Sequence, residues 1–172
     1  AGLDPDVRSV ASVFVSRWDK ATSDSVPERL RNRLGIAVAT TAYVAYRDLM
    51  ESDRWQRLAG LGARPQRLLF ASTGTKDPTA SDVLYIEALA APNTINTMPE
   101  ETLLALAHHG APRSVLPRGG GDSEQVLAEF VRAGVDMDAL AARLQEEGAQ
   151  AFVASWQHLR DSIAAKEKMT GG

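Results

Sequence analysis

The chain has 172 residues, of which 44% are hydrophobic and 24% are charged, so its composition is that of one globular domain of ordinary size. Its formal net charge is -3 and no basic run interleaves with aromatic residues, which argues against binding to nucleic acid or to an anionic membrane surface. The sequence contains no cysteine, which excludes disulfides and cysteine-bound zinc and fits a reducing cytoplasm.

The start of the chain shows no targeting pattern. No signal-peptide pattern opens it, and no apolar run reaches the roughly 18 residues that a membrane-spanning helix needs. We therefore expect a cytoplasmic location. The first residues, AGLDPD, lack an initiator Met, which is compatible with trimming or with a start inside a longer protein.

Residues 9–16 read SVASVFVS, which is apolar on both faces and rich in β-branched side chains. This pattern predicts a strand buried on both sides. We expect the strand to stop at Arg17, where the polar stretch RWDKATSDSVPER is predicted to form a loop. Apolar residues at helical spacing then predict a helix within residues 28–50.

The segment DVLYIEALAA is compatible with either a strand or a helix. Its alanines and the preceding Asp77-Pro78 pair favour a helix that ends before Pro92, and we choose the helix. The other elements predicted here are a short helix holding Trp55 and Leu58, a buried strand RLLFAS over 67–72, a short strand TINTM over 94–98, and a helix from Pro99 to Gly110.

The last third of the sequence is predicted to be helical. Asp122 and Gln125 are expected to form a capping box for a helix over residues 123–133. A further helix is expected to end near Gly148, and a last one to bury Trp156, with all of these helices packed outside the sheet. The glycines 119–121 are interpreted as a connector because no strand leads into them.

Three strands that alternate with helices predict a parallel sheet. A parallel sheet must be covered or closed, and three strands leave two unpaired edges. The barrel of eight strand–helix units typically needs about 250 residues, which exceeds this chain. The sheet is therefore either small and open, or it is the end of a larger barrel.

Three segments resemble consecutive signature segments of transaldolase, particularly of the longer actinobacterial type: SVASVFVSRWD, PQRLLFASTGTKDP and LYIEALAAPNTINTMPEETL. The helix AVATTAYVAYRDLMESDRW is also similar to the one that lies between the first two. The resemblance covers nearly the whole chain and is weaker over residues 119–142. It implies an α/β fold that is the C-terminal part of a (β/α)8 TIM barrel, with strands six to eight in residues 1–118 and a helical extension in 119–172 packing on the same domain.

The resemblance also implies an activity. Transaldolases move a dihydroxyacetone unit between sugar phosphates, from sedoheptulose 7-phosphate to glyceraldehyde 3-phosphate, through a Schiff base on a lysine of the fourth strand. A Schiff-base lysine must be partly neutral, which normally requires an apolar pocket or a nearby cation. The four lysines are Lys20, Lys76, Lys166 and Lys168, and none lies in an apolar strand. We therefore expect the nucleophile on an N-terminal part of the barrel and no catalytic residue on this chain.

By resemblance, Arg17 and Ser72 match the arginine and the serine with which the family binds the substrate phosphate. Each follows a predicted strand, and phosphate sites of such barrels often use the loops after the last strands. Other transaldolases place a second arginine just after the serine, whereas this sequence has STGTK, so Lys76 is expected to supply that charge. Arginine grips phosphate oxygens as a fork, and hydroxyl and backbone N–H groups add hydrogen bonds.

Other polar residues near these segments carry weaker predictions. Asn93, Asn96 and Thr97 are candidates for lining the pocket, or cap the next helix instead. The histidines 108, 109 and 158 are interpreted as helix-end or surface residues, and no metal site is predicted. STGTKDP lacks the P-loop spacing, and no cofactor is expected.

Two functions from different classes remain open at this point. The first is a transaldolase whose N-terminal half, carrying the lysine, is the partner of this chain, with sugar phosphates as substrates and a homodimer as a possible assembly. The second is a non-catalytic module that binds sugar phosphates or presents its strand edges to a partner. Neither nucleic acid nor a membrane is an expected partner.

Overall fold

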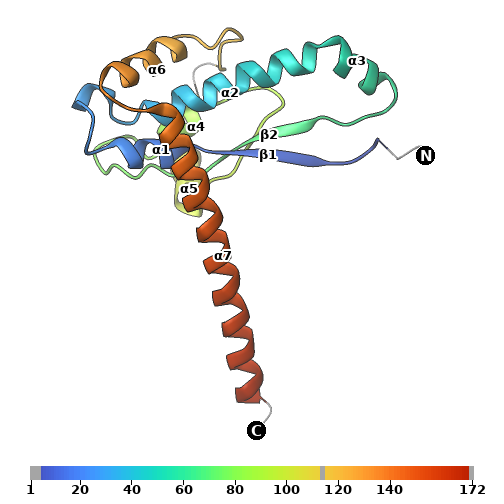
Figure 1. Ribbon diagram of the computed structural model, residues 1–172, viewed down its shortest axis with the longest axis vertical. Coiled ribbons are helices and arrows are strands. Elements are labelled where there is room, and N and C mark those ends of the chain that lie inside the picture. Colours follow the sequence, from blue (N-terminus) through green and yellow to red (C-terminus); the bar gives the residue numbers. More distant parts are fainter. Residues whose placement is uncertain (1–4, 113–114, 171–172) are drawn as a thin grey trace. The chain divides into compact units, whose positions relative to one another are not determined.

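The computed structural model describes residues 5–112 and 115–170, with side chains up to residue 166. The chain divides into two compact units, residues 1–134 and residues 135–172. The first unit is an α/β structure with a small parallel sheet, and the second contains one helix (Figure 1).

The sheet of the first unit has three strands in the order β1-β2-β3, all parallel. They are β1 (Ser9–Phe14), β2 (Gln66–Ala71) and β3 (Ile95–Asn96). The parallel pairing confirms the expectation drawn from the alternation of strands and helices. β3 is shorter than the predicted strand over residues 94–98.

The first part of the polar stretch after β1 is a helix, α1 (Val15–Thr22), so the prediction of a loop was wrong for residues 17–22, whereas residues 23–27 form no helix or strand. The buried side chains Val15, Ser16, Asp19 and Thr22 lie on one helical face, although three of them are polar. Because polar residues occupy that face, a search for apolar periodicity misses the helix. A short 3-10 helix, η1 (Glu28–Leu30), follows.

Two further helices lie between η1 and β2, and both were predicted: α2 (Leu34–Glu51) and α3 (Asp53–Gly60). The α3 helix begins at an N-cap, where the Ser52 hydroxyl accepts a hydrogen bond from the Trp55 backbone N–H at 3.2 Å. α2 packs along β1 and β2 (Figure 1), and its buried face closes the core of this unit. The core consists of Val15, Ala39, Tyr43, Leu68, Phe70, Tyr85 and Leu89.

The choice of a helix for DVLYIEALAA is confirmed by α4 (Leu84–Ala88). The next helix, α5 (Glu100–His109), also agrees with its prediction, with Pro99 before its first turn and Gly110 after its last. Glu100 and Glu101 in the first turn complement the positive end of the helix dipole.

The sheet is covered unevenly. Leu68 and Phe70 of β2 are buried under α2, whereas β1 is exposed over most of its length, with 45% of Val10 accessible. The prediction that β1 is buried on both faces was therefore wrong for this chain. One reason is that β1 is an edge strand of the sheet, so no other strand among the described residues pairs with its outer edge.

The α6 helix (Ser123–Arg132) packs against α2 through a face that buries Val126 and Phe130. The predicted capping box is absent, because Asp122 lies at ψ 9°, outside the extended conformation of an N-cap, and makes no side-chain cap. Its carboxylate instead pairs with the Arg33 guanidinium at 3.2 Å.

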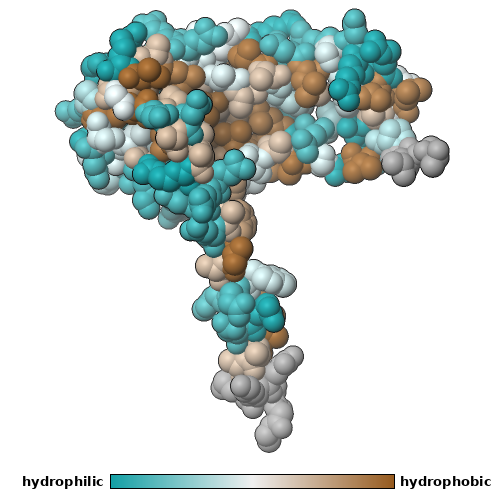
Figure 2. Space-filling view, in the orientation of Figure 1, coloured by the Kyte–Doolittle hydropathy of each residue, from teal (hydrophilic) through white to brown (hydrophobic). Residues whose placement is uncertain are grey.

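The second unit contains α7 (Met137–Thr170), one continuous helix in place of the two predicted. Gly148 lies inside it, since a single glycine costs a helix only about 1 kcal/mol. Trp156 is 62% exposed, so its prediction as a core residue was wrong. Hydrophobic side chains lie among hydrophilic ones along this helix in Figure 2. In the described part of the chain, no helix is both long and apolar enough to span a membrane.

Candidate functional site

The carboxyl ends of the three parallel strands lie at one edge of the sheet, which we call the carboxyl edge. Arg17 follows β1, Ser72 and Lys76 follow β2, and Asn96 and Thr97 lie at the end of β3. Five of the six residues predicted to bind substrate therefore lie at or just beyond this edge. Functional groups of parallel α/β folds gather at such an edge.

A pair of serines joins the segments that follow β1 and β2. The hydroxyls of Ser16 and Ser72 lie 2.8 Å apart, and the Ser16 backbone N–H donates to the Ser72 carbonyl oxygen at 3.0 Å. Ser72 has a φ of 56°, the left-handed region that residues other than glycine seldom adopt. Ser16 was not predicted from the sequence, although its position next to Arg17 was a signal.

The Arg17 guanidinium stacks on an aromatic ring. Its central carbon lies 4.3 Å from the centroid of the Phe14 ring, which is within the range of a cation–π contact. Arg17 is partly buried and makes no ion pair with any residue that the structure describes. Its N–H donors therefore remain available to an anion.

A second link joins β2 to β3 at the same edge. The Thr73 hydroxyl lies 2.8 Å from the Asn96 side-chain oxygen and 2.8 Å from the Thr97 carbonyl oxygen. The Thr97 backbone N–H also donates to the Phe70 carbonyl oxygen at 2.9 Å. Asn96 and Thr97 are thus held next to the segment that carries Ser72. Thr73 is fully buried and was not predicted.

Asn93 lies at the other end of β3. It precedes the strand, is exposed, and has a φ of 60° in the turn that enters it. Because the strands are parallel, a residue before β3 is separated from the carboxyl edge by the length of the strand. Asn93 therefore lies at the opposite end of β3 from Thr97.

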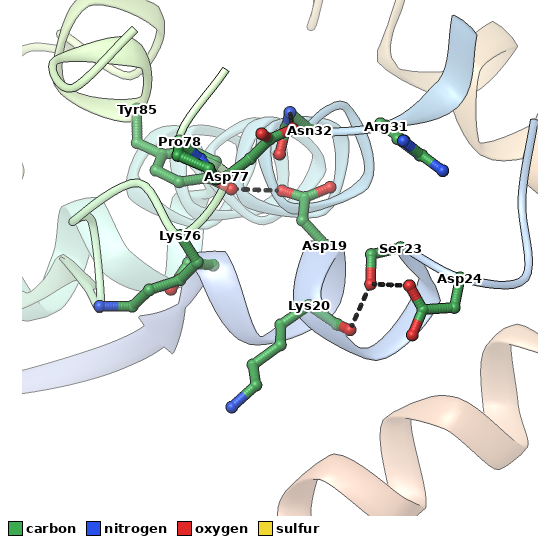
Figure 3. A pocket seen from close by; sticks show the side chains of 11 residues that line it. Asp19, Lys20, Ser23, Asp24, Arg31, Asn32, Lys76, Asp77, Pro78 and Tyr85 are labelled. Carbon is green, nitrogen blue, oxygen red and sulfur yellow. Dashed lines mark hydrogen bonds between the residues drawn. The ribbon is translucent and has the colours of Figure 1, made fainter. Parts of the chain in front are cut away.

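A cavity of about 490 Å³ opens beside the carboxyl edge (Figure 3). In Figure 3 the side chains of Lys20 and Lys76 extend to one side of it, away from Asp19. Arg17 and Ser72 do not line this cavity, so it adjoins them instead of containing them. Its lining consists of Ser16, Asp19, Lys20, Ser23, Asp24, Arg31, Asn32, Lys76, Asp77, Pro78 and Tyr85.

The charged groups around the cavity differ in how they are bonded. Each of its three carboxylates, Asp19, Asp24 and Asp77, already accepts at least one hydrogen bond. The basic residues Lys20, Arg31 and Lys76 form no side-chain ion pair with a residue in the described ranges. The charged side chains without an ion-pair partner are therefore the basic ones. This excess of available positive charge favours the binding of an anionic ligand near this edge.

Asp19 is a buried carboxylate with three donors. It accepts from the backbone N–H groups of Leu34 at 2.9 Å and Gly35 at 3.2 Å, and from the Tyr85 hydroxyl at 2.8 Å. Burial raises the pKa of Asp19 above its ordinary value, and these hydrogen bonds oppose that shift. Burial and the nearby Asp19 charge raise the pKa of Tyr85, which remains a hydrogen-bond donor.

Asp77 fixes the segment that carries Lys76. Its carboxylate accepts from the Thr79 hydroxyl at 2.7 Å, from the Thr79 backbone N–H at 2.9 Å and from the Asn32 amide at 2.7 Å. These hydrogen bonds lower the pKa of Asp77 to about 2. The segment after β2 is therefore tied to the residues that precede α2.

The lysines with described side chains are all exposed: Lys20, Lys76 and Lys166. None of them lies in the apolar surroundings that a Schiff-base lysine normally requires. Within residues 5–112 and 115–166, no three histidine or acidic side chains are grouped to hold a metal ion. His109, which lies in the last turn of α5, contacts Asp82 at 2.9 Å.

The family model for transaldolase and fructose-6-phosphate aldolase matches residues 1–163. The chain is 45% identical over 172 residues to a transaldolase of Parafrankia sp. (strain EAN1pec), covering 95% of this chain and 47% of that protein. It is 44% identical over 175 residues to the transaldolase of Thermobifida fusca (strain YX), with 95% of this chain and 47% of that protein covered.

A more distant relative is the transaldolase of Neisseria meningitidis serogroup A, which is 37% identical over 153 residues and covers 89% of this chain and 44% of that protein. The chain therefore belongs to the transaldolase/fructose-6-phosphate aldolase family, a family of enzymes, as the sequence motifs indicated. It spans about half the length of the relatives that it matches.

Proposed function

We propose that this chain is the C-terminal half of a transaldolase and that β1, β2 and β3 are the sixth, seventh and eighth strands of its TIM barrel. One observation carries the proposal: side-chain hydrogen bonds link the three consecutive parallel strands at their carboxyl edge. Ser16 bonds with Ser72 between β1 and β2, and Thr73 bonds with Asn96 between β2 and β3. The exposed edge and face of β1 fit a barrel that continues beyond this chain. The chain covers 47% of the length of the Parafrankia transaldolase, as expected for half of such a protein.

The proposed reaction transfers a dihydroxyacetone unit from sedoheptulose 7-phosphate to glyceraldehyde 3-phosphate, which yields erythrose 4-phosphate and fructose 6-phosphate. The unit is carried as a Schiff base on a lysine of the N-terminal half. The exposed positions of Lys20, Lys76 and Lys166 support this assignment, because an ammonium group in water is a poor nucleophile at neutral pH. This chain then contributes binding and orientation and no nucleophile.

In this proposal, Arg17 and Ser72 bind the substrate phosphate. Arg17 supplies a charged fork with no ion-pair partner among the described residues, and Ser72 supplies a hydroxyl whose direction is set by Ser16. Lys76 adds a second positive charge from the same segment as Ser72. Holding the phosphate at this edge places the carbonyl carbon of the sugar over the barrel axis, and such orientation lowers the barrier to attack by the lysine.

A second candidate is a non-catalytic partner module. The observation that favours it is an apolar groove of about 580 Å³ between β1, α2 and α3, lined mostly by hydrophobic side chains such as Tyr46, Leu49 and Trp55. An exposed strand edge next to an apolar groove is a surface on which another chain can add a strand. Intact-mass measurement of the purified protein separates the candidates. A companion polypeptide of similar size supports the split enzyme, and a lone stable monomer of this chain supports the module.

Borohydride trapping tests the proposed reaction. The protein assembled with its N-terminal half is incubated with fructose 6-phosphate and sodium borohydride, and the labelled peptide is identified by mass spectrometry. We expect the label on a lysine outside these 172 residues. Label on Lys76 would overturn the assignment of the nucleophile to the N-terminal half.

A further inference from the structure

The α1 helix is held at two points, and Arg17 lies between them. At its start, Ser16 is joined to Ser72 by a backbone and a side-chain hydrogen bond. One turn later, Asp19 is joined to α2 and to α4. Because α1 follows β1 without a loop, its direction depends on these two attachments.

The attachment to α2 replaces a missing helix cap. The residue at the N-cap position of α2 is Arg33, whose side chain makes no cap, so the first N–H groups of that helix need another acceptor. Asp19, which lies 15 residues earlier in the sequence, accepts from Leu34 and Gly35. Its negative charge also interacts favourably with the positive end of the helix dipole.

The attachment to α4 is a single hydrogen bond from the Tyr85 hydroxyl. The Tyr85 ring is 1% exposed and belongs to the core cluster, so packing fixes where its hydroxyl points. α4 follows the segment that carries Ser72 and Lys76. The bond therefore connects the residues after β1 with the residues after β2 at a second place, beside the cavity of Figure 3.

We propose that Asp19 and Tyr85 form a positioning pair that sets the orientation of α1 and thereby directs the Arg17 guanidinium toward the substrate phosphate. Neither residue contacts the phosphate in this arrangement. The inference rests on the proposed phosphate role of Arg17. It adds that Asp19 and Tyr85 connect Arg17 to the hydrophobic core and so fix its direction. A purely structural pair would affect unfolding alone, whereas a positioning pair also affects the affinity for an anion.

Tyr85→Phe is the sharpest variant, because it removes one hydroxyl and leaves the ring and the bonds from Asp19 to α2 in place. The matched control is Tyr43→Phe, which removes a hydroxyl from a second buried tyrosine of the same core, on α2. Affinity for inorganic phosphate is measured by titration of the chain assembled with its N-terminal half. The Arg17 Nε–Hε NMR signal, assigned with Arg17→Ala, reports the guanidinium itself, and circular dichroism reports folding.

We expect Tyr85→Phe to weaken phosphate binding by about 3- to 10-fold, the effect of one hydrogen bond, and to shift the Arg17 signal of the free protein. Tyr43→Phe is expected to change neither. Asp19→Asn, which keeps an acceptor but loses the charge, is expected to weaken binding at least as much and to lower the Tm.

Three outcomes contradict these expectations. If the parent chain binds phosphate and Tyr85→Phe binds it as tightly with an unmoved Arg17 signal, the positioning pair is refuted while the proposed function stands. If Tyr43→Phe weakens binding as much as Tyr85→Phe, the effect belongs to the core in general and the inference also fails. If phosphate leaves the Arg17 signal of the parent chain unchanged, the proposed phosphate role of Arg17 fails and the inference fails with it.

Discussion

Ser16 and Ser72 lie 56 residues apart in the sequence, yet their hydroxyls share a hydrogen bond of 2.8 Å. The bond holds the segment that follows β1 against the segment that follows β2. It also determines which way the Ser72 hydroxyl points, because Ser72 is held in a left-handed backbone conformation beside α1. The proposed phosphate site therefore depends on Ser16, a residue to which the proposal assigns an orienting role.

Ser16→Ala should weaken phosphate binding without unfolding the protein. The substitution frees the Ser72 hydroxyl to rotate, while the backbone bond from Ser16 to Ser72 remains. One lost orienting hydrogen bond predicts a loss of about 3- to 10-fold in affinity. Titration with inorganic phosphate measures it, and Ser23→Ala, an equivalent change elsewhere in the cavity lining, serves as the control. Equal affinities of the parent and Ser16→Ala proteins would contradict the role assigned to Ser16.

Arg17→Ala combined with Ser72→Ala should act on phosphorylated substrates selectively. Charge-assisted hydrogen bonds contribute about 1.5 to 3 kcal/mol each, so we expect the KM for fructose 6-phosphate to rise at least about 10-fold. The KM for free dihydroxyacetone should change little, since it carries no phosphate. The measurement is steady-state kinetics of the protein assembled with its N-terminal half. A similar rise for both substrates would argue against a phosphate role.

Gly35→Ala should destabilise the fold. A Cβ at Gly35 would lie 2.4 Å from the Val15 carbonyl oxygen and 2.7 Å from an Asp19 carboxylate oxygen, so α1 and α2 would have to separate. Overpacking of this kind costs about 1 to 3 kcal/mol. Urea unfolding measures the loss. Gly60→Ala on α3 is the control, because a Cβ there meets no atom within 4 Å, and we expect it to be neutral or slightly stabilising.

Asp77→Asn should reduce the dependence of the unfolding free energy on pH between about pH 4 and pH 2. The pKa of Asp77 is lowered from 3.8 to about 2, so its contribution to stability is present above about pH 4 and is lost as the pH falls toward 2. The raised pKa of Asp19 acts in the opposite direction, so the quantity to measure is the difference between the parent and variant unfolding free energies at each pH. A difference that is constant from pH 4 to pH 2 would contradict the assignment. Asn32→Ala, which removes one of the donors to Asp77, should reproduce part of the effect.

Phe130→Ala should show whether α6 unfolds together with the sheet. Phe130 is fully buried where α6 packs on α2, and such a substitution typically costs about 3 to 5 kcal/mol. Val131→Ala, at the neighbouring position with 57% of its side chain exposed, should cost little. Hydrogen exchange of the β2 amides reports the outcome. Unchanged protection of β2 in Phe130→Ala would mean that α6 forms a separate cooperative unit.

Local patterns in the sequence were sufficient for the elements whose stability is local. The apolar runs containing Phe14 and Phe70 predicted β1 and β2, and Pro99 with Gly110 predicted both ends of α5. The family motifs gave Arg17 and Ser72 as site candidates, and the alternation of strands and helices was enough to predict the parallel sheet.

Other features depend on contacts between distant residues, and only the tertiary structure decided them. α1 is a helix because its polar residues find partners 15 to 66 positions away: Leu34 and Tyr85 for Asp19, and Ser72 for Ser16. The spacing of apolar residues in the sequence cannot predict hydrogen bonds between such distant residues. The sequence by itself thus determined the family, the strands and the residues at their ends, whereas the tertiary hydrogen bonds decided how those residues are held together at the carboxyl edge.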